Sequence, residues 1–390
     1  MVSLRLALRN IMGAGLRTWL NVIVLSFSFI IIIWLKGLLD GWDRQAIQDM
    51  ILWEIAEGQY WVNDYDPTDP FSLSAAHAPV PEQLATHLLQ GELTPLLYTQ
   101  GTIYPKGRLQ SILIKGIEPE QDIIAVPSDL LHAGLDEIPA IIGTGMATST
   151  GLKEGDFVTL RWRDKRGAFD AAQVKIIGIF KTNVPSVDAG QVWIPIETLR
   201  KMMLLPDEAT ILICKDKAPS AHTPAGWTFM DQDELLMDLQ KIIRSKSMTS
   251  MFIWAILLMV AMLAIFDTQV LSIFRRQKEI GTYVALGMTR RRVVTLFTVE
   301  GAMHAIFATI LGTLYGLPLL YMQVHRGINL PVSSEDYGLT MAEKLYPVYS
   351  LGLILGTVVV VVIVTTLVSY WPARKIAKMN PTDALRGRLQ

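Results

Sequence analysis

Four apolar stretches constrain the fold of this chain more than any other feature of its sequence. They cover residues 19–39, 251–274, 302–322 and 349–368, and each is about 20 residues long. A helix of that length can cross the hydrocarbon core of a bilayer. Hydrophobic residues make up 51% of the chain and the mean hydropathy is positive, which is unusual for a soluble globular protein. The sequence therefore predicts an α-helical membrane protein with four transmembrane helices.

Basic residues are placed unevenly along the chain, and their placement predicts its orientation. Fourteen lysines and arginines lie in segments 1–18, 275–301 and 369–390, against three acidic residues. Loops on the cytoplasmic side of a membrane carry such an excess of basic residues. We therefore expect both termini and segment 275–301 to be cytoplasmic. The chain is then a multi-pass membrane protein.

The N-terminal apolar stretch has two interpretations. Basic residues precede it, as they do in a secretory signal. However, the stretch 19–39 is longer than the apolar core of a signal, and no A-x-A cleavage site follows it. We interpret it as a retained transmembrane helix, preceded by an amphipathic helix over residues 1–18.

The interval between the first and second apolar stretches contains no further run of membrane length, so we expect it to form an extracytoplasmic domain of mixed α/β structure. The expected order is a cytoplasmic amphipathic helix (1–18), transmembrane helix 1 (19–39), a periplasmic α/β domain with helical stalk ends (40–250), transmembrane helix 2 (251–274), a cytoplasmic segment (275–301), transmembrane helix 3 (302–322), an outer loop (323–348), transmembrane helix 4 (349–368) and a cytoplasmic tail (369–390).

Within the extracytoplasmic domain, the two ends differ from the centre. Apolar residues recur at helical spacing over 42–51 and 235–243, so these ends are expected to extend the first two transmembrane helices as a stalk; ordinary surface helices are the alternative. The glycine-rich stretch 141–156 lacks the spacing of a phosphate-binding loop, and we expect a turn that leads into a strand. Predicted strands cover 59–62, 111–117, 157–162, 174–180, 192–196 and 210–214, the last with Cys214 buried.

The segment after the second apolar stretch carries a family resemblance. It reads Arg276-Gln277-Lys278-Glu279-Ile280-Gly281-Thr282-Tyr283-Val284-Ala285-Leu286-Gly287. This order resembles the R-x-x-E-I-G-x-x-x-A-x-G segment of FtsX/MacB/LolC-type ABC permeases. In that family the segment is the coupling region that sits on the ATPase subunit. The resemblance implies a role in ATPase coupling for Glu279, Ile280, Gly281, Leu286, Gly287, Arg290 and Arg291.

Individual residues of this segment have alternative interpretations. Glu279 either balances the surrounding basic charge or pairs with it to fix the helix presented to the ATPase. Gly281 and Gly287 are expected where the backbone needs a positive φ or a close approach. The arginines at 290–292 would bind lipid phosphates, the ATPase surface or both, which the sequence does not separate.

The end of the chain also resembles this family. Segment 371–386 matches the closing segment of these permeases, with Pro381, Ala384 and Leu385 as the residues that define the match. A generic basic tail beside a membrane is the alternative. The start of the chain and stretch 141–156 resemble the corresponding parts of the same family, so the resemblance covers most of the chain.

Motifs for catalysis are not found in the sequence. It has no Walker Gly-Lys-Ser/Thr, no His-Glu-x-x-His and no nucleophile elbow, and its six histidines are dispersed. With one cysteine, it has no disulfide framework and no cysteine-based zinc site. The formal net charge of -1 gives no general attraction to nucleic acid. We therefore expect no enzyme, no metal and no cofactor in this chain, with ATP and Mg²⁺ bound by a partner.

Asp267 is an ionisable residue inside the second apolar stretch. Such a group costs several kcal/mol in a membrane unless it finds a polar partner. We favour a polar contact between helices, supported by the neighbouring Thr268 and Gln269. A proton or ion pathway is the alternative, and the sequence does not decide whether Asp267 is structural or functional.

The function expected from the resemblance is that of a permease subunit of an ABC transporter. Two ATPase subunits and a second permease, identical or different, would complete it, with a periplasmic carrier or adaptor and membrane lipid as further partners. The layout is closest to that of LolC/LolE-like permeases, which release lipoproteins from the inner membrane. MacB-like export of peptides or drugs through a partner channel and FtsX-like regulation of cell-wall hydrolases are the alternatives. A lipid-anchored cargo needs a lateral opening, for which we expect Leu35, Leu38, Leu39, Met251, Phe252 and Trp254.

Overall fold

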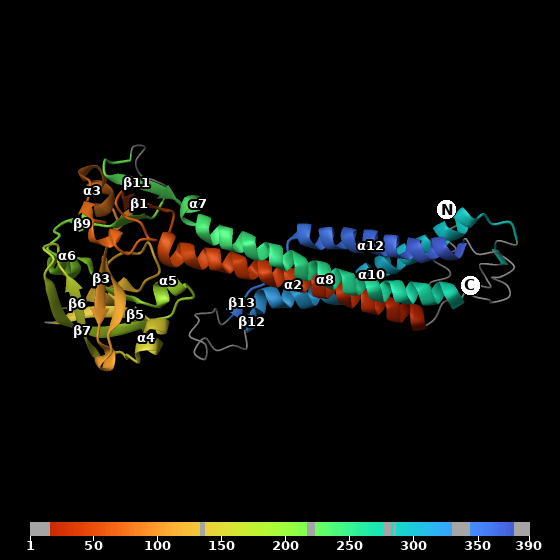
Figure 1. The fold of residues 1–390 in the computed structure, drawn as a ribbon, viewed down its shortest axis with the longest axis horizontal. Coiled ribbons are helices and arrows are strands. Elements are labelled where there is room, and N and C mark those ends of the chain that lie inside the picture. Colours follow the sequence, from red (N-terminus) through yellow and green to blue (C-terminus); the bar gives the residue numbers. More distant parts are fainter. Residues whose placement is uncertain are drawn as a thin grey trace. The chain divides into compact units, whose positions relative to one another are not determined.

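The computed structural model describes residues 16–132, 137–216, 223–275, 282–283, 286–329 and 344–377. The chain divides into two compact units, which are described separately (Figure 1). The helical unit comprises Met1–Asp43, Ile243–Ile328 and Lys344–Gln390. The α/β unit comprises Arg44–Ile242 and Asn329–Glu343.

Four helices of the described chain are long and apolar enough to cross a membrane, judged by length and composition. They are α2 (Leu16–Met50), α8 (Met237–Arg275), α10 (Arg290–Arg326) and α12 (Leu351–Ala377). Each predicted apolar stretch lies within one of them, apart from the first two residues of the fourth stretch. The helices also continue through polar residues, so that α2 extends to Met50 and α8 already begins at Met237. The four apolar helices and the mixed α/β region between the first and second are therefore confirmed.

The core of the helical unit lies where α2 and α10 approach each other closely. Gly316 makes the approach possible, since a Cβ atom there would lie 2.2 Å from Cδ1 of Ile30. One turn earlier, a Cβ atom on Gly312 would lie 3.1 Å from the ring of Phe29. Small residues four apart have this effect in membrane helices. The buried apolar residues of this core are Val22, Leu25, Phe29, Ile30, Ile33, Ala305, Ala308, Leu320 and Val361.

The α/β unit is built on a nine-stranded sheet with short helices around it. The strand order is β11-β1-β10-β3-β4-β8-β5-β7-β6. The strands are β1 (Gly58–Val62), β3 (Leu93–Ile103), β4 (Gln110–Ile117), β5 (Ile138–Gly143), β6 (Phe157–Arg163), β7 (Phe169–Phe180), β8 (Gln191–Pro195), β10 (Ile211–Cys214) and β11 (Trp227–Asp231). Two short ribbons pair β2 (Ala78–Pro79) with β9 (Glu208–Ala209) and β12 (Ile328–Asn329) with β13 (Lys344–Leu345). The helices are η1 (Ile51–Ile55), η2 (Ser72–Ser74), α3 (Glu82–Leu89), η3 (Pro105–Gly107), η4 (Ser128–His132), α4 (Thr144–Thr150), α5 (Pro185–Asp188), α6 (Ile196–Met203) and α7 (Gln232–Leu235).

Six of these strands close into a barrel, because β3 also pairs with β6. The eleven-residue β3 pairs with two different strands along one of its edges. Its first part pairs with β10 through Leu93–Leu96, and its last part pairs with β6 through Gly101–Ile103. The interior is filled by apolar side chains, among them Leu97, Ile114, Ile142, Leu160, Val174 and Ile194. The barrel is therefore a packed core rather than a channel.

The predicted strands correspond to β1, β4, β6, β7, β8 and β10, and Cys214 is buried in β10 as expected. The strands β3, β5 and β11 of this sheet were not predicted. The expectation that stretch 141–156 forms only a turn into a strand is wrong, because residues 144–150 form helix α4. The helix ends at Gly151, whose φ of 69° is left-handed, and the turn is limited to the residues between it and β6. Gly145 is needed because its backbone lies close to Asp188. Its N–H donates to the Asp188 carboxylate at 2.8 Å, and a Cβ atom on residue 145 would clash with that carboxylate.

Candidate functional site

A groove of about 410 Å³ opens between α2, α8 and α12 in the helical unit. Lys36 of α2 lies on one side of it, and Met251 and Trp254 of α8 lie on another. The wall formed by α12 is shallow because two of its residues, Gly352 and Gly356, have no side chain. A Cβ atom on Gly356 would have no neighbour within 4 Å, so these glycines leave space instead of allowing a helix to pack there.

The chemistry of the groove suits an apolar chain with a polar end. Most of its lining is apolar, and its remaining lining residues are Ser247, Leu353 and Thr357. Thr357 donates its hydroxyl to the Leu353 carbonyl of its own helix at 2.8 Å, so that hydroxyl is already satisfied. Lys36, the cation among the described lining residues, pairs with Asp40 one turn along α2. An acyl chain lying here would pack against these apolar side chains by van der Waals contact, which drives association inside a membrane.

The helix α8 exposes large apolar side chains, both in the groove and beside it. Met251 and Phe252 are both about 70% exposed, and the most apolar 18-residue window of α8 has no buried residue. Large exposed apolar surfaces of this kind mark contact with lipid or with another protein.

The segment expected to couple to an ATPase is described only in part. Glu279, Ile280 and Gly281 lie outside the described residues. A short helical turn precedes Gly287, with the Leu286 N–H donating to the Thr282 carbonyl at 2.9 Å. Gly287 then adopts a φ of 92°, in agreement with the expectation of a positive φ. The Leu286 side chain, next to this glycine, is 80% exposed.

The helix α10 begins directly after this turn with three arginines. Thr289 has extended backbone angles at the N-cap, and Arg290 and Arg291 occupy the first exposed positions of the helix. Basic residues are unfavourable at a helix N-terminus because the macrodipole is positive there. The arginines therefore do not stabilise α10, and their charge is available to an acidic protein surface or to lipid phosphates.

The α/β unit contains a second arrangement, which we call the junction: residues 49–54 at the end of α2 and in η1, with the side chains that hold them. The Asn183 amide donates to the Asp49 carboxylate at 3.1 Å, and the ring of Trp53 stacks on Phe180 with centroids 5.7 Å apart. Burial raises the pKa of Asp49, and the Asn183 hydrogen bond opposes that shift. The end of the first long helix is therefore fixed to the sheet by both polar and aromatic contacts.

At the centre of the junction, a buried lysine faces a carboxylate. Lys115 of β4 is 2% exposed, and its Nζ lies 3.8 Å from an oxygen of Glu54 in η1. The ammonium also lies over the rings of Tyr98 and Trp193, 4.6 and 4.8 Å from their centroids. Burial lowers the pKa of Lys115, while the Glu54 carboxylate opposes this shift. Glu54 is also held by the Ser186 hydroxyl, which donates to it at 2.6 Å.

Comparisons with known proteins agree on the class of this chain. Residues 251–381, from α8 to beyond α12, match the family model of the FtsX-like permease C-terminal domain. LolC of Neisseria meningitidis, named a lipoprotein-releasing system transmembrane protein, is 24% identical over 75% of this chain and 77% of its own length. The chain thus contains an FtsX-like permease domain, and its relatives are ABC permeases of the LolC and MacB type.

Two further relatives of the permease are more distant or match less of it. MacB of Sodalis glossinidius, named a macrolide export ATP-binding/permease protein, is 25% identical over 54% of this chain, which spans only 33% of MacB. The crystal structure of the extracellular domain of the transporter YknZ is 15% identical and covers 42% of this chain and 84% of that domain. Its TM-score is 0.26, so we draw no argument from that likeness.

The structure brings together some of the predicted site residues and separates others. Met251 and Trp254 line the groove, whereas Leu35, Leu38, Leu39 and Phe252 do not. Pro381, Ala384 and Leu385, which carry the C-terminal resemblance, lie outside the described residues. Asp267 is exposed on α8 and makes no side-chain hydrogen bond or ion pair in the part of the permease that the structure describes. Its predicted contact with another helix therefore stays a prediction.

Two features of the permease were missed by the sequence analysis. The groove depends on Gly352 and Gly356, whose four-residue spacing is more typical of glycines that admit a neighbouring membrane helix. The junction depends on Lys115, whose strand was predicted without any sign that the lysine is buried. Among the described residues, no group of three or more His, Cys, Asp or Glu is placed to hold a metal ion.

Proposed function

We propose that this permease couples ATP hydrolysis by a separate ATPase subunit to movement of its α/β unit on the outer side of the inner membrane, and that it thereby releases lipoproteins. The observation that carries the proposal is the extent of the LolC match, which includes both the apolar helices and the α/β region and covers three quarters of each chain. The groove supports it, because an acyl chain would fit its apolar lining.

The proposed complex contains two ATPase subunits and a second permease, identical or different. Family members are ABC permeases that work with ATPase subunits. The exposed apolar side chains of α8 would be covered by the second permease or by lipid. A periplasmic carrier or adaptor would receive the cargo. The exposed Leu286 and the arginines that begin α10 would contact the ATPase.

MacB-like export is the second candidate function. It is favoured by several MacB relatives, which match about half of this chain at 22 to 26% identity. In that case the cargo would be a peptide or drug from the periplasm, and the groove would hold lipid.

A photo-crosslinking experiment separates the two functions. A benzoyl-phenylalanine at Met251 should capture acylated protein in native membranes, because this position lines the groove, and ATP turnover should deplete the adduct. The matched control is Leu314, an exposed position of α10 outside the groove, which should capture phospholipid only. If both positions capture only phospholipid, and peptides or drugs stimulate the ATPase, the MacB-like function replaces lipoprotein release.

The proposed topology is tested by cysteine labelling in spheroplasts. A cysteine that replaces Lys153, exposed in the α/β unit, should react with a membrane-impermeant maleimide from outside. A cysteine that replaces Leu286 should react only after lysis. The native Cys214 can be kept, because it is fully buried and burial raises its pKa to about 12, so its thiolate is not available. Labelling of position 286 in intact spheroplasts would contradict four membrane-spanning helices with cytoplasmic termini.

A further inference from the structure

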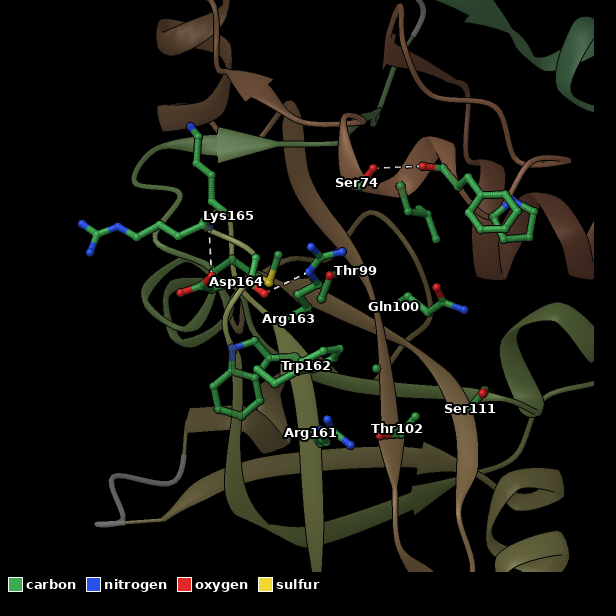
Figure 2. Close-up of a pocket in the computed structure, with 18 of the residues that line it drawn as sticks. Ser74, Thr99, Gln100, Thr102, Ser111, Arg161, Trp162, Arg163, Asp164 and Lys165 are labelled. Carbon is green, nitrogen blue, oxygen red and sulfur yellow. Dashed lines mark hydrogen bonds between the residues drawn. The ribbon is translucent and has the colours of Figure 1, made fainter.

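The α/β unit has a pocket of about 730 Å³ on the outer surface of its barrel, in addition to the groove and the junction (Figure 2). Residues of β3 and β4, such as Thr102 and Ser111, form one wall. The strand β6 and the turn after it form another, and the segment that includes η2 closes a third side. This volume is in the range of small-molecule sites, about 300–1,000 Å³.

Three arginines give the pocket a positive charge. Arg161 and Arg163 are two residues apart on β6, so both point to the outside of the barrel, while Trp162 between them is buried. Arg166 follows in the turn. In Figure 2 the two arginines lie at different heights along β6, Arg161 near Thr102 and Arg163 near Thr99.

The carboxylates near these arginines are engaged elsewhere. The Asp164 carboxylate accepts the backbone N–H groups of Arg166 and Ala168 at 2.9 and 2.8 Å. Glu208 accepts from Lys165 at 3.0 Å and also contacts His77. Although burial alone would raise the pKa of Glu208, these two partners lower it, so the carboxylate stays ionised and neutralises Lys165. Arg163 donates from Nε to the Gly167 carbonyl at 3.1 Å, and Arg161 hydrogen-bonds the Tyr104 side chain, but neither neutral partner cancels a guanidinium charge. The three arginines outnumber the Asp164 carboxylate, so the pocket keeps a positive charge.

The rim of the same pocket carries large apolar side chains in solvent. Phe71 is 87% exposed, Phe169 is 66% exposed and Leu109 is 62% exposed. The Arg161 guanidinium lies 4.3 Å from the centre of the Phe169 ring, so a cation and an aromatic face already form one surface. Guanidinium groups next to exposed apolar side chains are complementary to a molecule that is anionic at one end and apolar at the other.

We propose that this pocket binds a small anionic amphiphile, with a phosphate group on Arg161 and Arg163 and an apolar part against Phe71, Leu109 and Phe169. A phosphate is favoured because several guanidinium donors can bond its oxygens at once. The pocket volume admits a headgroup with a short chain rather than a whole diacyl lipid. The site is separate from the groove, and its ligand does not depend on which cargo the permease moves.

The test uses the full chain in nanodiscs of phosphatidylcholine, with hexyl phosphate as the probe, isothermal titration calorimetry as the measurement and empty nanodiscs as the blank. Hexyl phosphate should bind, inorganic phosphate should bind more weakly and hexyltrimethylammonium should not bind. The double variant Arg161→Gln, Arg163→Gln should bind hexyl phosphate with an affinity lower by about tenfold or more. Phe71→Ser should lower the affinity for hexyl phosphate but not the affinity for inorganic phosphate, since this exposed ring would contact only the hexyl chain. Lys153→Gln, which removes an exposed charge elsewhere on the unit, is the control and should change nothing.

Other outcomes would overturn the proposal. Equal affinity for hexyl phosphate and inorganic phosphate would identify a plain phosphate site. Tighter binding of a tetraglutamate peptide would identify a peptide site. Unchanged binding in the double arginine variant, with the melting temperature preserved, would place the probe outside this pocket.

Discussion

Replacing Glu54 with Ala should destabilise the α/β unit by about 3 kcal/mol, the low end of the range for removing one partner of a buried ion pair. Lys115 would lose the carboxylate that faces it and would stay surrounded by Tyr98 and Trp193. For a unit of this size, the loss corresponds to a fall in melting temperature of about 6–12 °C. Thermal unfolding of the full chain, followed by tryptophan fluorescence, measures it.

A double-mutant cycle separates the ion pair from general damage. The variant that combines Glu54→Ala with Lys115→Met should recover most of the stability lost in Glu54→Ala, because it removes the buried charge together with its partner; the Lys115→Met single variant completes the cycle. Asp122→Asn is the matched control, since it breaks the exposed pair between Asp122 and Lys215 and should cost less than about 1 kcal/mol. If Glu54→Ala costs no more than this control, the junction is not held by the pair.

The difference in stability between the wild type and Lys115→Met should change with pH in a defined direction. Burial lowers the pKa of folded Lys115 below its ordinary value of 10.5, so the unfolded chain binds more protons between the two values. The contribution of Lys115 to the free energy of unfolding therefore rises with pH between its folded pKa and 10.5. The wild type should gain stability relative to Lys115→Met when the pH is raised in the alkaline range, and a constant difference would contradict a buried ammonium.

The apolar helices were predictable because their length alone decides between a helix and any other structure. The positions of their ends were not, since α2 and α8 continue through polar residues that also suit a surface helix. The barrel strands were found where polar and apolar residues alternate. The strand β3 was missed because it is buried on both faces for most of its length, which removes the alternation, and because Pro95 and Gly101 interrupt it.

The candidate sites depend on contacts between distant parts of the chain, which a pattern along the chain does not contain. In the sequence Ser111–Ile117, Lys115 is at a position typical of a solvent-facing residue. It is buried because η1 brings Glu54 and β8 brings Trp193 to the same place. The glycines of α12 are equally ambiguous, since a small residue either admits a neighbouring helix or leaves a space. The same spacing has the first effect in α10 and the second in α12.

Substituting leucine for one glycine of each pair should therefore have opposite consequences. Gly316→Leu should disrupt the helical unit, because its Cβ atom would lie 2.2 Å from Cδ1 of Ile30 and the added leucine would force the Ile30 side chain or the two helices to shift. Overpacking of this kind costs about 1–3 kcal/mol or more. The amount of monodisperse protein after extraction and its melting temperature should both fall.

Gly356→Leu should leave folding intact, since no atom lies within 4 Å of the added Cβ and leucine favours a helix over glycine by about 1 kcal/mol. Its side chain would instead occupy the groove beside Met251 and Trp254. If the groove holds an acyl chain, the loss of two methylene contacts at about 0.8 kcal/mol each should lower capture of acylated protein by about tenfold. Crosslinking from position 251 in the Gly356→Leu background measures this, with basal ATPase activity of the assembled complex as the control. Normal capture in a correctly folded Gly356→Leu variant would show that the cargo takes another route.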